Sequence, residues 1–288
     1  MNKTKKLNIV TKKLSPKKAQ KKHKKGLSKS RSRKARRSMP VGLVPVLAAV
    51  LSALCIAVIP FLSGRQKGVK GDPVPKGYSS YCIDISHHNG TRIQWDSIYV
   101  MTDRSGRTCT SIEDAADARK PAFIFIKATE GTDFTDKNFK KNWASAEDSG
   151  IRRGAYHFFH PSSDPARQAE HFLRTVGTLS HGDLPPVLDI ETLPRGCTGT
   201  MLTEAASVWL ETVAAATGRK PIVYTSDSFA RDLLGTEITG KYPVWIAHYR
   251  VREPVFGDWK MWQFTDRAVI HGIRGKVDLS VVAQGFNP

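Results

Sequence analysis

The amino-acid sequence predicts an α/β protein: an irregular (β/α)8-type barrel with fewer than eight helices, preceded by a single transmembrane helix and a basic disordered tail. Three observations lead to this prediction. Short apolar, β-rich runs recur eight times between residues 79 and 288, with helical patterns between several of them, and strands that alternate with helices form parallel sheets. Polar side chains gather where these runs end. An uncharged apolar stretch directly follows a strongly basic N-terminal segment.

The basic segment comprises residues 1–38. It holds 17 of the 45 Lys and Arg residues of the chain and none of its 26 Asp and Glu residues. Residues 39–288 therefore carry 28 basic and 26 acidic residues, a net charge of +2. A charge confined to a tail does not indicate specific nucleic-acid binding. A Ser-rich tail without aromatic residues cannot bury enough apolar surface to fold. We expect a disordered cytoplasmic tail, with contact to anionic lipid or nucleic acid as an alternative.

Residues 39–63 are predicted to be a transmembrane signal anchor. Residues 41–62 are uncharged, and at about 1.5 Å per residue they can cross a hydrocarbon core of roughly 30 Å. The basic tail stays in the cytoplasm by the positive-inside rule, so we expect a single-pass membrane protein with its folded domain in the periplasm or at the cell surface. A buried core helix is one alternative. A cleaved signal peptide is another, although the long basic region and the lack of a small-x-small site argue against it.

Residues 64–78 are rich in Gly, Pro and Lys and predict a flexible linker, which leaves residues 79–288 for the barrel. The predicted strands are residues 81–85, 122–127, 154–158, 186–190, 221–225, 243–247, 260–264 and 276–279. The predicted helices are residues 111–119, 136–149, 164–176, 203–217 and 226–234, with Asp136 and Asp164 as N-caps and Gly150 and Gly218 after helix ends. Little room for helices remains beyond residue 247.

Functional side chains are concentrated at the ends of the predicted strands. In a barrel these ends meet at one mouth, where active sites of this architecture lie. The side chains are Asp84, Lys127, Glu130, Tyr156, His157, Asp189, Glu191, Tyr224, Trp245, Tyr249, Gln263 and Asp278.

Two of these acids, Asp189 and Glu191, predict a specific chemistry. They stand two residues apart at the end of an apolar strand, so both side chains point to the same face. When two carboxylates lie this close together, the repulsion between their charges raises the proton affinity of one of them. Glycoside cleavage needs such a pair, one protonated acid for the leaving oxygen and one carboxylate beside it. Two solvated acids at a strand end are the alternative.

Seven short motifs add a resemblance. They are residues 83–90 (IDISHHNG), 123–131 (FIFIKATEG), 154–159 (GAYHFF), 186–191 (PVLDIE), 244–249 (VWIAHY), 261–264 (MWQF) and 277–279 (VDL). In this order and at these spacings the sequence resembles the family 25 glycoside hydrolases, lysozymes of the muramidase type. The resemblance covers residues 79–288 and does not extend to residues 1–78.

The resemblance implies a peptidoglycan hydrolase that cuts the β-1,4 bond between N-acetylmuramic acid and N-acetylglucosamine, without metal or cofactor. It implies that Glu191 is the general acid and Asp189 its assisting carboxylate. Asp84 and Asp278, at the ends of the first and last strands, would be the other acids of the pit and would face each other because the barrel closes. The implied substrate-binding residues are Tyr156, Trp245, Tyr249 and Gln263, to which we add Glu130 and Lys127 at the end of the second strand.

Other classes of function remain possible at this stage. A catalytically silent glycan-binding module tethered to the membrane would not need all four acids. A zinc hydrolase would need His87, His88, His157, His160 or His248 to converge with a carboxylate, and hydrogen-bonded histidines are the simpler interpretation.

Residues 99–120 form a longer, Cys-containing excursion than is usual in the family, which we expect at the closed end of the barrel, away from the chemistry. Cys55 lies in the apolar segment. Of the three remaining cysteines, Cys82 and Cys109 form the one pair that does not have to cross the barrel, with Cys197 on a loop at the mouth. We expect a Cys82–Cys109 disulfide, with three free thiols as the alternative.

Overall fold

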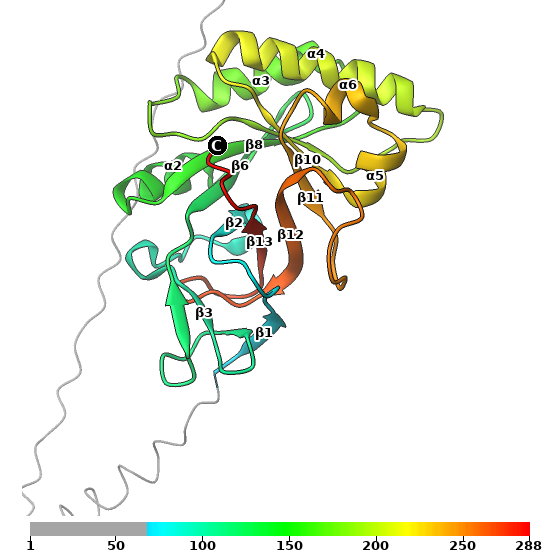
Figure 1. Cartoon of the computed structure of the whole chain (residues 1–288). Coiled ribbons are helices and arrows are strands. Elements are labelled where there is room, and N and C mark those ends of the chain that lie inside the picture. The colour runs from blue at the N-terminus through cyan, green and yellow to red at the C-terminus, as the bar shows by residue number, and fades with distance from the viewer. Residues whose placement is uncertain (1–67) are drawn as a thin grey trace, which may run out of the picture. The chain divides into compact units, whose positions relative to one another are not determined.

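The computed structural model describes residues 68–288, in which eight strands close a barrel (Figure 1). The barrel strands are β2 (Tyr81–Ile85), β6 (Phe123–Glu130), β8 (Arg152–Phe158), β9 (Val187–Ile190), β10 (Ile222–Ser226), β11 (Val244–Ala247), β12 (Trp259–Ala268) and β13 (Val277–Val282). Pairing of β2 with β6 closes the ring, and β7 (Phe134–Thr135) adds a short hairpin to β6. All eight predicted barrel strands are confirmed.

The predicted tail and membrane anchor lie outside the described residues. Among the helices of residues 68–288, none is both long and apolar enough to cross a membrane.

One strand of the barrel runs against the others. β2, β6, β8, β9, β10, β11 and β12 are parallel, whereas β13 is antiparallel to both of its neighbours, β12 and β2. The mouth at the carboxyl ends of the parallel strands is therefore also where β13 begins. Asp278 stands near the start of its strand, not at its end as expected from the sequence, and it still reaches the mouth.

The helices are few and follow the middle strands. They are α2 (Phe139–Asp148), α3 (Pro165–Val176), α4 (Gly199–Thr217), α5 (Asp227–Asp232) and α6 (Gly235–Thr239), with short 3-10 turns η1 (His87–Asn89) and η2 (Trp95–Ser97). Asp164 caps α3 through the backbone N–H groups of Ala166 and Arg167, and Gly218 ends α4 in the left-handed conformation (φ 65°), as predicted. Asp136 does not cap α2, which begins after Asn138.

A second, four-stranded antiparallel sheet packs against the barrel where helices are missing. It contains β1 (Lys70–Pro73), β3 (Val100–Thr102), β4 (Arg107–Cys109) and β5 (Asp117–Arg119), in the order β1-β4-β3-β5. Figure 1 shows β1 beside the end of β12, and Thr108 Oγ1 accepts the backbone N–H of Val269 just beyond that end. We call this the outer sheet.

The outer sheet corrects three predictions. Residues 70–73 of the predicted flexible linker form β1, and the predicted helix at residues 111–119 is a turn followed by β5. The excursion at residues 99–120 reaches the mouth end of β12 and is not confined to the closed end. The helical pattern of residues 111–119 is nine residues long and had no predicted cap, so its preference for a helix is weak. Pairing of β5 with β3 overrides that preference.

The predicted Cys82–Cys109 bridge is also wrong, because both thiols are free. Cys82 shares its strand face with Asp84 and packs inside the barrel in a cluster with Phe125 and Met261. Cys109 lies on β4 of the outer sheet, paired with Met101. The two residues belong to different sheets, and the side chain of Cys82 points into the barrel, so the two thiols are not brought together.

The interior below the mouth is filled by aromatic rings, and Gly154 makes room for one of them. A Cβ atom on Gly154 would lie 2.3 Å from Cε1 and 2.5 Å from Cδ1 of the Phe125 ring. Phe125 is completely buried and packs on Trp245 at a centroid distance of 5.1 Å. The glycine is needed here for close approach and not for a turn.

We expect Gly154→Ala to lower the free energy of unfolding by about 1–3 kcal/mol or more, because the Phe125 ring has no free space into which to move. Urea denaturation of the two proteins measures the difference. Gly182→Ala is the matched control, since a Cβ atom there would meet no atom within 4 Å and the backbone is not left-handed. Equal stability of the two variants would contradict this account of the interior.

Candidate active site

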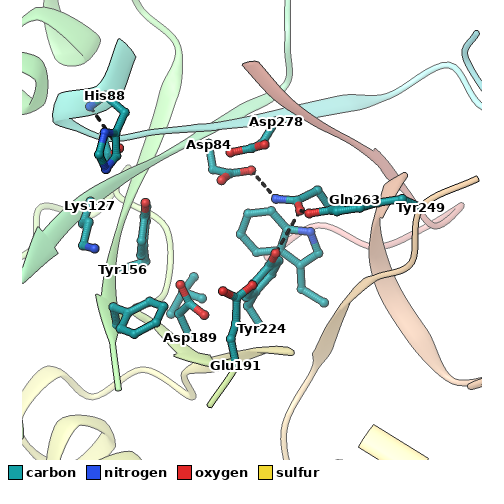
Figure 2. Close-up of a pocket in the computed structure, with 14 residues that line it drawn as sticks. Asp84, His88, Lys127, Tyr156, Asp189, Glu191, Tyr224, Tyr249, Gln263 and Asp278 are labelled. Atoms are coloured by element: carbon teal, nitrogen blue, oxygen red, sulfur yellow. Dashed lines mark hydrogen bonds between the residues drawn. The ribbon is translucent and has the colours of Figure 1, made fainter. Parts of the chain in front are cut away.

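The barrel mouth holds an open pit of about 280 Å³ lined by side chains from all eight strands and the loops beyond them. Alternate residues of each strand point inward, so one or two positions of each strand reach the pit. Figure 2 shows Asp84 and Asp278 on one side of the pit and Asp189 and Glu191 on the other. The structure thus brings together the four acids that the sequence predicted.

Asp189 and Glu191 extend from the end of β9 into the pit. Asp189 is only 7% exposed, whereas Glu191 is exposed at the mouth. Oδ1 of Asp189 is buried and has no hydrogen-bond partner among residues 68–288. Burial raises the pKa of Asp189 well above its usual 3.8, and the charges of Glu191 and Asp84 raise it further. Asp189 therefore retains a proton more strongly than an ordinary Asp.

Asp84 and Asp278 are directly opposite each other in the β2–β13 register. Burial is the largest cause that raises the pKa of Asp84, followed by the charge of Asp278. Burial and the nearby Asp266 raise the pKa of Asp278 to about 6, against a lowering by its hydrogen bond with Asp84. The two carboxyls titrate as a coupled pair, so near neutral pH they hold a proton between them more readily than two separate acids would.

Gln263 connects two tyrosines to this pair. Tyr224 donates its hydroxyl hydrogen bond to Oε1 of Gln263 at 2.8 Å, and Tyr249 donates to the same oxygen. Nε2 of Gln263 donates to Oδ1 of Asp84 at 2.9 Å. Burial raises the pKa of both tyrosines, so they remain donors. The amide of Gln263 can then point only one way, which fixes Asp84 as an acceptor.

Trp245 forms the floor of the pit. Its ring is 2% exposed, its Nε1 donates to Oγ of Ser280 at 2.9 Å, and it packs edge-on against Tyr224 with centroids 4.9 Å apart. The sequence suggested that Trp245 holds sugar, but a ring this buried offers little of its face to a ligand. Tyr249, which is 37% exposed, is better placed for that contact.

Lys127 and Tyr156 line the pit as predicted, whereas Glu130 does not. Glu130 instead accepts from Lys127 Nζ at 2.6 Å and lies 3.0 Å from Nε2 of His160. Its contact with a residue that lines the pit is this ion pair with Lys127. The predicted substrate set also lacked five residues that line the pit: Ser86, His88, Phe158, Val187 and Tyr224. Tyr224 was noted at a strand end, and the other four lie within the quoted sequence motifs.

The histidines considered for a metal site have other contacts. His157 is buried between β8 and the helices, contacts Thr129 and Gln168 through its two ring nitrogens, and stacks on Trp209. Burial lowers its pKa to about 3. His87 contacts Asp136 at 2.8 Å. Within residues 68–288, no group of three or more His, Cys, Asp or Glu side chains is arranged to hold a metal ion.

Comparisons with known proteins agree with this geometry. The model of the family "Glycosyl hydrolases family 25" matches residues 83–273. Over 211 residues the chain is 38% identical to YegX, an uncharacterized protein of Escherichia coli K12, covering 72% of this chain and 71% of that protein. Over a further alignment of 211 residues it is 33% identical to lysozyme M1 of Streptomyces globisporus, covering 68% of this chain and 65% of that protein.

Two solved structures show the same fold. One is a bacterial lysozyme from Streptomyces coelicolor, with a TM-score of 0.59 and 31% identity over 72% of this chain and 93% of that one. The other is a family 25 glycosyl hydrolase from Bacillus anthracis, with a TM-score of 0.60 and 29% identity over 77% of this chain and 95% of that one. The protein is thus a glycoside hydrolase of the lysozyme type, and the chain belongs to glycosyl hydrolase family 25.

Proposed function

We propose that the protein is an N-acetylmuramidase that cuts the β-1,4 bond between N-acetylmuramic acid and N-acetylglucosamine in peptidoglycan strands. The observation that carries the proposal is the pair of carboxyls at the end of β9, one buried and one exposed, facing the same pit. Relatives named lysozyme M1 and N,O-diacetylmuramidase support this substrate class.

Glu191 acts as the general acid. It stands exposed at the mouth, where a polymer can place its glycosidic oxygen within reach, and it has Asp189 beneath it on the same strand face. Loss of the leaving group requires a proton at that oxygen, which a positioned carboxylic acid supplies.

Asp189 assists from below. Its buried Oδ1 lacks a partner among the described residues, and an unpaired acceptor in a pit is suited to an N–H donor on the substrate. The acetamido group of an N-acetyl sugar offers that donor next to the reacting carbon. In this role Asp189 orients the acetamido group while Glu191 protonates the leaving oxygen.

The opposite wall stabilises the charge that develops on the sugar. Asp84 and Asp278 face the β9 pair across the pit, and the transition state of glycoside cleavage carries positive charge on the ring. Lys127, Tyr156, Tyr249 and Gln263 hold the sugar by hydrogen bonds and apolar contact, with Trp245 below them.

Digestion of purified peptidoglycan by the full-length protein tests the proposal. We expect disaccharide muropeptides whose reducing end is N-acetylmuramic acid, identified by mass spectrometry after borohydride reduction. Fragments ending in N-acetylglucosamine would assign a different bond. Binding to the strands without any cleavage would support the silent glycan-binding module instead.

We also propose that residues 39–63 anchor the enzyme in a membrane with the barrel outside the cytoplasm, as the uncharged segment after the basic tail indicates. A reporter enzyme active only outside the cytoplasm, fused after Pro288, should then be active, and the fusion should sediment with membranes. Recovery of a soluble form that begins near Gly64 would identify a cleaved signal peptide instead.

A further inference from the structure

A second groove, of about 380 Å³, lies between the outer sheet and the β12–β13 loop. We call it the basic groove, because five cationic side chains and only one acid line it: Lys70, Arg107, Arg267, Arg274, Lys276 and Asp72. Its floor is apolar and includes Val269 and Ile273, each 5% exposed.

Three of the five cations are free to meet a ligand. Lys70 is paired with Asp103 at 2.7 Å, and Arg107 lies 4.0 Å from Asp72. The side chains of Arg267, Arg274 and Lys276 are exposed and have no ion pair or hydrogen bond within residues 68–288. The groove therefore presents uncompensated positive charge around an apolar floor.

The basic groove borders the catalytic pit. Lys276 precedes Asp278 by two residues, at the start of β13. Nδ2 of Asn89 donates to the backbone oxygen of Lys276 at 3.3 Å, and Asn89 follows His88, which lines the pit. A polymer seated in the pit can thus place a branch in the groove without a long span.

We propose that the basic groove binds the acidic stem peptide carried by the N-acetylmuramic acid of the strand being cleaved. This inference rests on the proposed function. A stem peptide presents free carboxylates and alanine methyl groups. The free cations of the groove attract those carboxylates, and the exposed apolar side chain of Val69, which also lines the groove, accepts the methyl groups.

The test compares two double variants. Arg274→Gln/Lys276→Gln removes two free cations of the groove. Arg167→Gln/Lys220→Gln is the matched control, because both residues are exposed, have no ion-pair partner in the described part of the chain, and lie on α3 and just before β10. All four positions are exposed, so melting temperatures should stay at the wild-type value.

Two substrates separate peptide from sugar recognition. One is purified peptidoglycan freed of phosphodiester polymers, and the other is the same material after an amidase has removed its stem peptides. For the groove variant we expect kcat/KM about tenfold lower on the intact material and unchanged on the stripped strands. The control should match wild type on both, and about 0.5 M salt should abolish the difference on intact material.

Binding is measured separately by co-sedimentation. Two proteins are compared: Glu191→Gln alone, and Glu191→Gln combined with Arg274→Gln/Lys276→Gln. Weaker binding to intact strands alone is expected. Equal losses on both substrates, or no loss on either, would each overturn the inference. If the wild-type enzyme cleaved neither substrate, the proposed function would fail while co-sedimentation still decided what the groove binds.

Discussion

Replacing Glu191 with Gln should lower the rate of peptidoglycan cleavage by roughly 10²–10⁴-fold, the contribution of a positioned general acid. The amide keeps the size and position of the carboxyl and loses the proton that the leaving oxygen needs. Binding of strands should persist, because the other pit residues are unchanged. Release of labelled muropeptides under single-turnover conditions measures the chemical step.

The control for this substitution is Glu204→Gln, which changes an exposed Glu on α4 in the same way. It should leave the rate unchanged. Muropeptide release by Glu191→Gln at a rate near wild type would remove Glu191 from the role of acid and leave the pit without its proposed proton donor.

Asp278→Asn should have two opposite effects: a severe loss of activity and a gain in stability at neutral pH. Activity falls because the wall opposite Glu191 loses a carboxylate. Stability rises because ionised Asp278 is held in a buried, acidic place. The folded pKa of about 6 lies above the ordinary 3.8, so this carboxyl favours the folded state below pH 3.8, and that contribution disappears as the pH rises through 6.

The gain from Asp278→Asn should thus appear between pH 3.8 and 6 and level off above, at no more than roughly 3 kcal/mol, from about 1.4 kcal/mol per pKa unit. Thermal unfolding followed from pH 3.5 to 8 gives the curve. Asp133→Asn, at an exposed turn, should show no comparable rise. If Asp278→Asn were less stable than wild type at pH 8, ionised Asp278 would not destabilise the folded state, contrary to this prediction.

The barrel could be predicted from sequence because its evidence is local. Each strand is a short buried run, and the acids Asp84, Asp189 and Glu191 stand at fixed places within or just after such runs. Strand direction carries no local signature, so the reversal of β13 was not visible. The position of Asp278 at the mouth was predicted correctly from a wrong assumption about the end of its strand.

Contacts between distant segments explain what could not be predicted. The Gly-Asp-Pro sequence of β1 is typical of a flexible linker. In the structure, Gly71 allows β1 to approach Thr108 closely, because a Cβ atom at residue 71 would lie 2.3 Å from Oγ1 of Thr108. The link from Tyr249 through Gln263 to Asp84 likewise spans β2, β12 and the loop after β11. Neither spacing nor composition encodes such a link.

The reversal of β13 also determines where the chain leaves the barrel. β13 begins at the mouth and ends at the opposite end, where the N–H of Val282 donates to the oxygen of Ser80 at 3.0 Å. Arg152, at the start of β8, binds Asn287 and Pro288 there. An enzyme immobilised on a solid support through Pro288 would therefore present its mouth to the solution, where even an insoluble network of glycan could reach it.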